Sequence, residues 1–178
     1  MYRLDPGPGV EWYDVDYPSI MALREQLYPP RPHYHRIAAS VTEPGWLDQI
    51  PADRRVLALG EGLTMYLTEP DGLALLRRIV DRFPSGELQF DAFSRLGIRS
   101  QWLNSVVRRS GSTLHWGIDG PPRDIVDAVP GVRLLAWVSP FESPSFHAVP
   151  REYRVMARVM SAIPALKKMM AQYHRYAF

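Results

Sequence analysis

The sequence contains no cysteine and no long apolar run. The absence of cysteine among the 178 residues excludes disulfides and thiolate metal sites, and it fits a reducing compartment. The longest apolar run, near residues 134–138, is far shorter than the roughly 20 residues that span a bilayer. The first residues have neither a basic start nor an apolar core, so we expect no signal peptide. We therefore expect a cytoplasmic protein without a membrane partner.

Neither sign of charge dominates the sequence. Lys and Arg number 21 and Asp and Glu number 19, which gives a formal net charge of +2. Only the pI of 9.0 would favour a nucleic-acid partner, and a net charge this small does not predict one. Apolar residues make up 46% and charged residues 22% of the chain, as in soluble globular domains. The length predicts a single domain over residues 1–178.

Stretches typical of strands alternate with stretches typical of helices. Strands are predicted at residues 10–15, 36–41, 55–59, 87–90, 113–118 and 132–139. Helices are predicted at residues 19–27, 43–50, 69–83, 98–109, 124–129, 151–163 and 165–175, and a loop at residues 141–150. The stretch RVLAL at 55–59 is apolar after Arg55 and shows no alternation, which is typical of a strand covered on both faces. The alternation predicts an α/β domain with a parallel sheet between two helical layers.

Polar side chains follow the first three predicted strands. Asp14 and Asp16 close the first strand, Ser40 closes the second, and Glu61 follows the third. Ligands of parallel α/β sheets bind at the carboxyl ends of strands, and an ionised carboxylate has two oxygens that can accept both hydroxyls of a ribose. The same spacing also fits a turn or cap role for Asp16 and a solvated loop acid at Glu61. Both interpretations stay open at this level.

Other motifs give weaker signals. The Gly-x-Gly pairs at 7–9 and 60–62 lack the third glycine of a dinucleotide fingerprint. His33 and His35 could place two ligands on one face, but without cysteine or a nearby third histidine a surface loop is favoured, and we predict no metal site. The arginines within 95–109 favour a solvated helix face over an anion-binding wall.

The segment GEGLTMYL at residues 60–67 resembles the E-G-[LV]-x-M-Y-L signature of the leucine carboxyl methyltransferase family. The branch it resembles most includes the tetracenomycin-type polyketide O-methyltransferases. WYDVDYP at 12–18 resembles the family's aromatic-acid-V-D-x-P strand end. Residues 37–41 and 83–91 resemble its third and fifth strands, and the likeness runs from about residue 3 to the C-terminus.

The resemblance implies a Rossmann-like class I fold that binds S-adenosyl-L-methionine. By position, Asp16 would hold the ribose hydroxyls, and Ser40 and Val41 would lie against the adenine. Relatives often carry an acid followed by Leu at those two positions. Glu61 would sit near the methionine part of the cofactor, and Tyr66 near the site of methyl transfer.

The resemblance also implies an N-terminally truncated sheet. Members of the family begin with a helical cap and a first strand that ends in a Gly-rich loop, and this sequence begins where that loop should finish. The missing first strand would lie between the strands predicted at 10–15 and 55–59. Those neighbours would close the gap, or a second copy would fill it, giving a homo-oligomer through exposed sheet edges.

Two functions follow as hypotheses. The first is an S-adenosylmethionine-dependent O-methyltransferase acting on a carboxyl or hydroxyl group of a small molecule such as a polyketide. A carboxylate acceptor is already ionised at neutral pH, whereas a hydroxyl needs a general base, and no obvious base is present. The second is a truncated, catalytically impaired methyltransferase-like protein that acts through association. The sequence does not identify the methyl acceptor.

Overall fold

A computed structural model describes residues 6–142, 148, 150–151, 154–155 and 171–178 of the chain. The chain divides into two compact units, Met1–Ala52 and Asp53–Phe178, and each is described here by itself. The prediction of a single domain over residues 1–178 stays a prediction. Among the described residues, no helix has the length and apolarity that crossing a membrane requires.

The first unit is a strand–helix–strand motif. It contains β1 (Trp12–Asp16), α1 (Pro18–Leu27), β2 (Tyr34–Ala38) and the 3-10 helix η1 (Gly45–Gln49). β1 and β2 are parallel. All four elements were expected from the sequence, with bounds that differ by up to three residues.

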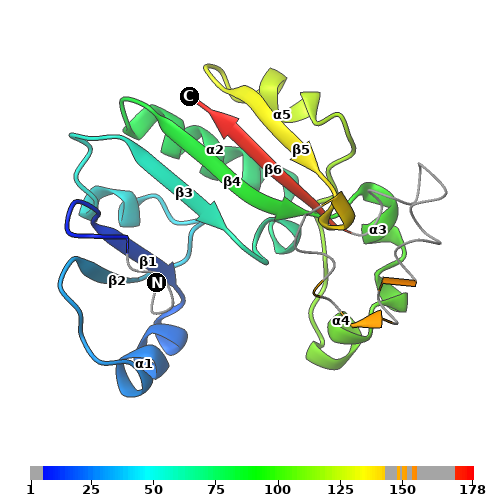
Figure 1. The fold of residues 1–178 in the computed structure, drawn as a ribbon, viewed down its shortest axis with the longest axis horizontal. Coiled ribbons are helices and arrows are strands. Elements are labelled where there is room, and N and C mark those ends of the chain that lie inside the picture. The colour runs from blue at the N-terminus through cyan, green and yellow to red at the C-terminus, as the bar shows by residue number, and fades with distance from the viewer. Residues whose placement is uncertain (1–5, 143–147, 149, 152–153, 156–170) are drawn as a thin grey trace. The chain divides into compact units, whose positions relative to one another are not determined.

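The second unit is built on a four-stranded sheet in the order β3-β4-β6-β5 (Figure 1). Its strands are β3 (Val56–Gly60), β4 (Gly86–Ala92), β5 (Arg133–Val138) and β6 (Gln172–Ala177). β3 and β4 are parallel, whereas β6 is antiparallel to both β4 and β5. The sheet is therefore mixed, and not parallel throughout as the sequence predicted.

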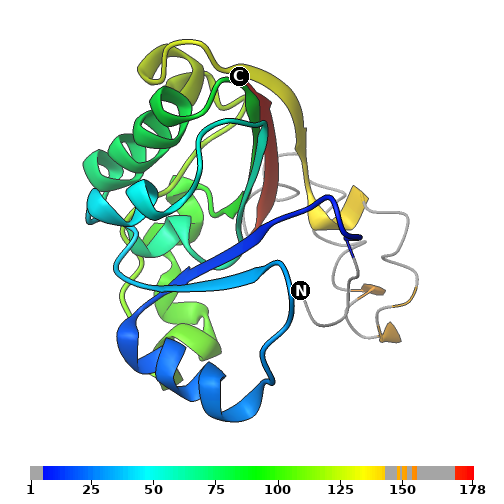
Figure 2. The ribbon, with the colours of Figure 1, turned by 90° about the vertical axis from the view of Figure 1, so that its left-hand side faces the viewer.

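Short helices and one long helix connect these strands. They are η2 (Thr64–Tyr66), α2 (Glu69–Arg82), α3 (Arg95–Arg99), η3 (Gln101–Leu103), α4 (Ser105–Ser110), α5 (Arg123–Ala128) and η4 (Pro140–Glu142). Helix α2 begins as predicted at Thr68, whose hydroxyl accepts the backbone N–H of Asp71 at 3.3 Å. α2 and α5 lie on the same face of the sheet (Figure 2).

The helix predicted at residues 165–175 is wrong from Gln172 onward, where the chain forms β6. Side chains alternate along β6, and Gln172, His174 and Tyr176 are the buried ones. This period of two indicates a strand. The sequence that precedes β6 is typical of a helix, so the prediction extended that helix through the residues of the strand.

The helix predicted at residues 98–109 is also wrong as one element. It is broken into α3, η3 and α4, and Trp102 is 66% exposed. The amide of Gln101 binds the backbone of Leu114 twice: Nε2 donates to its carbonyl at 3.1 Å and Oε1 accepts its N–H at 2.8 Å. The Ser100 hydroxyl donates to the carbonyl of Leu96 at 2.8 Å. Such side-chain bonds to the backbone compete with helical ones.

Three further predicted segments have partial outcomes. The strand expected at 113–118 forms a single parallel bridge, between Gly117 and Phe93. The loop at 141–150 and the helix at 151–163 lie largely outside the described residues.

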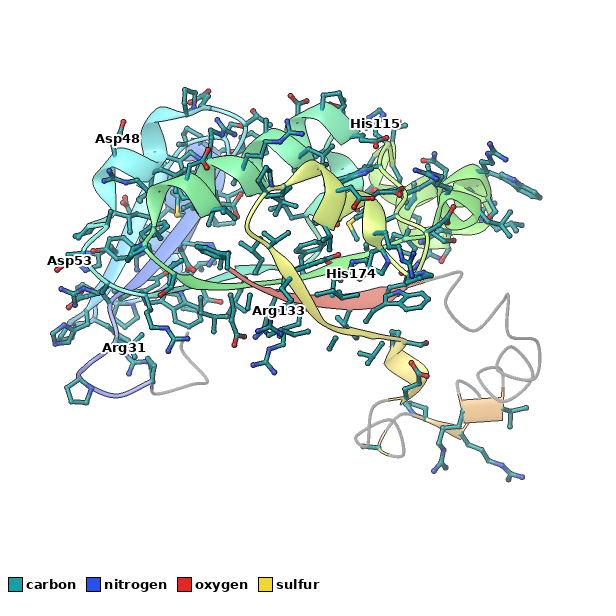
Figure 3. All side chains as sticks on the ribbon, turned by 90° about the horizontal axis from the view of Figure 1, so that it is seen from above. Arg31, Asp48, Asp53, His115, Arg133 and His174 are labelled. Atoms are coloured by element: carbon teal, nitrogen blue, oxygen red, sulfur yellow. The ribbon has the colours of Figure 1, made fainter. Side chains whose placement is uncertain are left out.

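A buried polar network joins β5, β6 and the loop before α5. Gln172 Nε2 donates to the carbonyl of Ile118 at 3.0 Å, and its Oε1 accepts from Trp137 Nε1. His174, labelled in Figure 3, places Nε2 3.0 Å from Gln172 Oε1 and Nδ1 3.1 Å from the Tyr176 hydroxyl. Because these groups satisfy one another, they can be buried without an unpaired polar atom.

Strand β3 is covered less than its sequence predicted. Leu57 is 54% and Leu59 is 53% exposed, and both point away from the partly buried Val56, Ala58 and Gly60. In the part of the chain that the structure describes, β1 is paired only with β2 and β3 only with β4. The missing first strand between β1 and β3 stays a prediction.

Candidate functional site

Two acids stand near the carboxyl end of β1, and the structure separates their roles. Asp14 accepts hydrogen bonds from Trp12 Nε1 at 2.8 Å, from Arg24 Nη1 at 2.9 Å and from the Tyr34 hydroxyl. These three donors occupy both of its oxygens. Asp14 therefore links β1 to α1 and β2, and both of its carboxylate oxygens already accept hydrogen bonds within the protein.

Asp16 is the freer of the two acids. Its Oδ1 accepts the backbone N–H of Tyr17 at 2.8 Å, whereas Oδ2 lies 3.7 Å from Arg24 Nη2, which is too long for a hydrogen bond. The side chain is 33% exposed. One oxygen thus supports the turn into α1, as the turn interpretation predicted, and the other can still accept a hydroxyl.

Ser40 and Val41 follow the neighbouring strand. The backbone N–H of Ala39 donates to the carbonyl of Asp16 at 3.0 Å, so the two strand ends lie side by side. The Ser40 hydroxyl is 2.7 Å from that of Thr42 and accepts the Thr42 N–H at 3.3 Å. Ser40 therefore shapes a turn, and the first unit brings together three of the predicted site residues.

The other predicted residues lie on one loop of the second unit. Glu61 is exposed and follows β3, and Tyr66 is 41% exposed in η2. Gly62, between them in sequence, has a φ of +62°, a conformation that L side chains rarely adopt. The GEG sequence therefore makes a tight turn at the carboxyl end of β3.

Sequence reasoning missed Asp91, at the corresponding end of β4. Its Oδ1 accepts the backbone N–H of Gly62 at 2.8 Å, and its carbonyl accepts the hydroxyl of Thr64. Burial raises the pKa of Asp91, the Gly62 N–H opposes this, and the charge of Glu61 adds to it. Asp91 directly follows a predicted strand, so the strand-end rule that selected Asp16 and Glu61 could have found it.

The predicted site residues fall into two groups. Asp16, Ser40 and Val41 belong to the first unit, and Glu61 and Tyr66 to the second. Since each unit is described by itself, a common crevice that contains both Asp16 and Glu61 stays a prediction.

The histidine pair lies at the opposite, amino end of β1 and β2. Glu11 accepts from both rings, with Oε1 2.7 Å from His33 Nδ1 and Oε2 2.7 Å from His35 Nε2. These hydrogen bonds lower the pKa of Glu11. Both histidines are exposed, as predicted, but His35 lies in β2 and not in a loop.

The arginine cluster is exposed on α3 and α4. Arg95 Nη2 lies 2.9 Å from Asp124 Oδ2, and its backbone N–H donates to Asp119 Oδ1 at 3.0 Å. Arg99, Arg108 and Arg109 are exposed to solvent. This agrees with a solvated helix face, and the anion-binding wall stays a prediction.

Two curated methyltransferases are similar to this chain. The tetracenomycin polyketide synthesis O-methyltransferase TcmP of Streptomyces glaucescens is 39% identical over 166 residues, which cover 93% of this chain and 61% of that protein. The S-adenosyl-L-methionine-dependent methyltransferase dpfgK of Gibberella zeae is 34% identical over 139 residues, covering 71% of this chain and 46% of that protein. The chain thus spans about half to three fifths of the length of these relatives.

A solved structure shares the fold. An S-adenosylmethionine-dependent methyltransferase from Mesorhizobium loti matches 94% of this chain and 81% of its own, with a TM-score of 0.57 at 13% identity. This confirms the α/β, Rossmann-like class I methyltransferase fold. No protein-family model matches the chain, so its place in the leucine carboxyl methyltransferase family stays a prediction. By its 39% identity, the chain is a homologue of the TcmP-type S-adenosylmethionine-dependent O-methyltransferases.

Proposed function

We propose that the chain binds S-adenosyl-L-methionine and forms part of an O-methyltransferase for a carboxyl or hydroxyl group of a small molecule, with polyketides as the favoured class. The observation that carries the proposal is the 39% identity to TcmP along 93% of this chain. We also propose that it works in the cytoplasm without a nucleic-acid or membrane partner.

The residues at the strand ends fit this cofactor. Asp16 Oδ2 lies 3.7 Å from Arg24 Nη2 and makes no hydrogen bond to it. This oxygen can therefore accept a ribose hydroxyl. Ser40 and Val41 lie beside it and offer a short polar and an apolar surface for a flat base. When bound, S-adenosylmethionine supplies a methyl group activated by a positively charged sulfur. The exposed carboxylate of Glu61 suits the positively charged α-amino group of that molecule.

The chain's own contribution to methyl transfer is orientation. A carboxylate acceptor needs no proton removed, so the protein has to hold the acceptor oxygen in line and exclude water. Tyr66, 41% exposed on the same loop as Glu61, is the side chain we propose lines that position. A hydroxyl acceptor would require a base, and for this reason we favour a carboxyl.

Calorimetric titration of the 178-residue chain with S-adenosylmethionine tests the proposal. We expect saturable heat, and Asp16→Ala and Glu61→Ala should each weaken affinity about tenfold, roughly 1.4 kcal/mol. Asp53→Ala is the matched control, because this exposed acid precedes β3 and its carboxylate pairs with Arg54. Unchanged affinity in both test variants would refute the assignment of the site.

Association is the second candidate function. The exposed Leu57 and Leu59 on β3 favour it. Among the described residues β3 pairs only with β4, and an apolar strand with an open edge attracts another chain. We propose a homo-oligomer through the sheet edges, which light scattering after size-exclusion chromatography would detect. Leu57→Lys should return the chain to a monomer. An oligomer that gives no heat with millimolar S-adenosylmethionine would favour association over catalysis. A monomeric wild-type chain would exclude association through the sheet edges.

A further inference from the structure

Asp91 links β4 to the loop after β3, just beyond the last residue pair of these two strands. Gly60 and Phe90 are the last residues in register between these parallel strands. Asp91 follows Phe90, and it reaches the loop after β3 twice, through Oδ1 to the Gly62 N–H at 2.8 Å and through its carbonyl to the Thr64 hydroxyl. One side-chain and one main-chain acceptor thus bridge β4 to two points of the loop.

Gly62, the residue of the turn that Asp91 contacts, has open space around its Cα atom. A Cβ atom placed on Gly62 would meet nothing within 4 Å, and Gly62 has a φ of +62°. Glycine in this region has more conformational freedom to lose than any other residue. The hydrogen bond from the Gly62 N–H to Asp91 therefore restrains the peptide between Glu61 and Gly62, which carries the Glu61 side chain next to it.

The environment of Asp91 does not favour its charge. Burial raises the pKa of its carboxyl group, and the nearby charge of Glu61 raises it further. When the pKa of a carboxyl group is higher in the folded than in the unfolded state, the free energy of unfolding falls as pH rises and the group ionises. The Asp91 carboxylate is thus poorly explained by stability alone, whereas its bond to Gly62 shapes the loop.

We propose that Asp91 is a positioning residue whose bonds to Gly62 and Thr64 hold the Glu61 turn in the conformation that binds the amino-acid end of S-adenosylmethionine. The inference rests on the proposed function, and it assigns part of the affinity for the cofactor to a residue that need not touch it. Thr64, 5% exposed, supplies the second anchor of the same loop.

Nuclear magnetic resonance of the Gly62 amide tests the contact without any ligand. In the wild-type chain the Gly62 proton shift should follow the ionisation of Asp91 as pH is varied. In Asp91→Asn the amide oxygen can still accept the bond, so the proton should stay protected from exchange while its titration disappears. In Asp91→Ala the protection should be lost. A Gly62 amide that exchanges equally fast in all three proteins overturns the proposal.

Titration with S-adenosylmethionine tests the consequence. We expect Asp91→Ala to weaken affinity about tenfold, or roughly 1.4 kcal/mol, and Asp91→Asn to restore most of it. Thr64→Val removes only the second anchor and should weaken binding in the same direction, which keeps the test available if Asp91→Ala does not fold. The control is Glu87→Gln, a change on the same strand at a carboxylate that pairs with Arg175, and it should leave affinity unchanged.

The outcomes separate this inference from the proposed function. Wild-type binding together with equal affinity in Asp91→Ala and Thr64→Val overturns the role of Asp91 and leaves the proposed function intact. A wild-type chain that gives no heat with S-adenosylmethionine overturns both the proposed function and the role of Asp91, whatever the Gly62 amide shows. Loss of affinity in Asp91→Ala with rescue by Asp91→Asn supports the positioning role, because a requirement for charge would not be met by the amide.

Discussion

At the scale of single residues, neighbouring acids of one strand carry different tasks. Asp14 is held by three donors and Asp16 by one within 3.5 Å. Hydrogen bonds to a charged acceptor contribute about 1.5–3 kcal/mol each when buried, and less when partly exposed. The count of bonds therefore predicts which acid serves the fold and which remains available to a ligand.

We predict that Asp14→Ala lowers the free energy of unfolding by about 2 kcal/mol, because Trp12, Arg24 and Tyr34 lose their shared acceptor. Asp16→Ala should change stability by less than about 0.5 kcal/mol while it weakens cofactor binding. Urea denaturation followed by tryptophan fluorescence measures the first effect and calorimetry the second. Equal destabilisation by both substitutions would contradict this division.

The same acids show how far sequence reasoning reached at the site. The strand-end rule selected Asp14, Asp16, Ser40 and Glu61, because it needs only the position of a polar residue after a predicted strand. It could not choose between Asp14 and Asp16, since the donor Arg24 lies ten residues away on a helix. The same rule could have selected Asp91, which follows a predicted strand, but its bond to Gly62, 29 residues earlier in the chain, could not be predicted.

At the scale of elements, a glycine lets α2 pack closely against the segment before α5. A Cβ on Gly72 would lie 2.0 Å from Cζ3 of Trp116, a ring that is 5% exposed. In a helix interior, alanine is favoured over glycine by about 1 kcal/mol. Overpacking in a core costs about 1–3 kcal/mol, and an overlap this deep should exceed the gain in helix propensity.

We therefore predict that Gly72→Ala lowers the free energy of unfolding by a net of about 1–2 kcal/mol. Urea denaturation measures the change. Gly45→Ala is the matched control, because a Cβ there meets nothing within 4 Å. A Gly72→Ala protein as stable as the wild type would mean that Trp116 does not occupy the position described.

A second element-scale feature is the ion pair that joins β4 and β6. Glu87 accepts two bonds from Arg175, at 2.7 and 2.8 Å, which lower the pKa of Glu87 from its ordinary 4.5 to about 2. A depressed acid pKa stabilises the fold above the unfolded value and loses that effect as pH falls through the folded value.

The contribution of this pair should thus be complete above pH 4.5, and it should disappear between pH 4.5 and about 2. We predict that Glu87→Gln lowers the urea midpoint at neutral pH and flattens its decline across that acid range. The effect should be small and should shrink in high salt, because the pair is open to solvent. A decline with the wild-type slope would show that other acids dominate.

At the scale of the whole molecule, most elements could be predicted and the sheet order could not. The apolar run of β3 and the capped, amphipathic α2 are local signals, and both elements were confirmed within one or two residues. β6 was missed because its identity depends on partners far away, with Glu87 and Arg175 separated by 88 residues. No local pattern carries such information.

The central place of β6 gives a prediction for the second unit. β5 pairs with β6 and not with β4, and the backbones of Gly86 and Phe178 exchange two hydrogen bonds, at 2.9 and 3.0 Å. A chain that ends before Ala171 should lose cooperative unfolding and its near-ultraviolet circular dichroism. Tyr173→Ser, at a side chain 50% exposed on β6, is the control that keeps the pairing. A cooperative melt of the shortened chain would contradict the central role of β6.

The order of the strands along the chain also bears on biosynthesis. β6 is the last of the four strands of its sheet to leave the ribosome, yet it is the one that links β4 to β5. During translation, the completed β4 and β5 therefore wait with facing edges uncovered, and nascent chains in this interval are open to capture by chaperones or by one another. Closure of this sheet is an event that follows synthesis of its final strand, and it cannot proceed strand by strand as the polypeptide emerges.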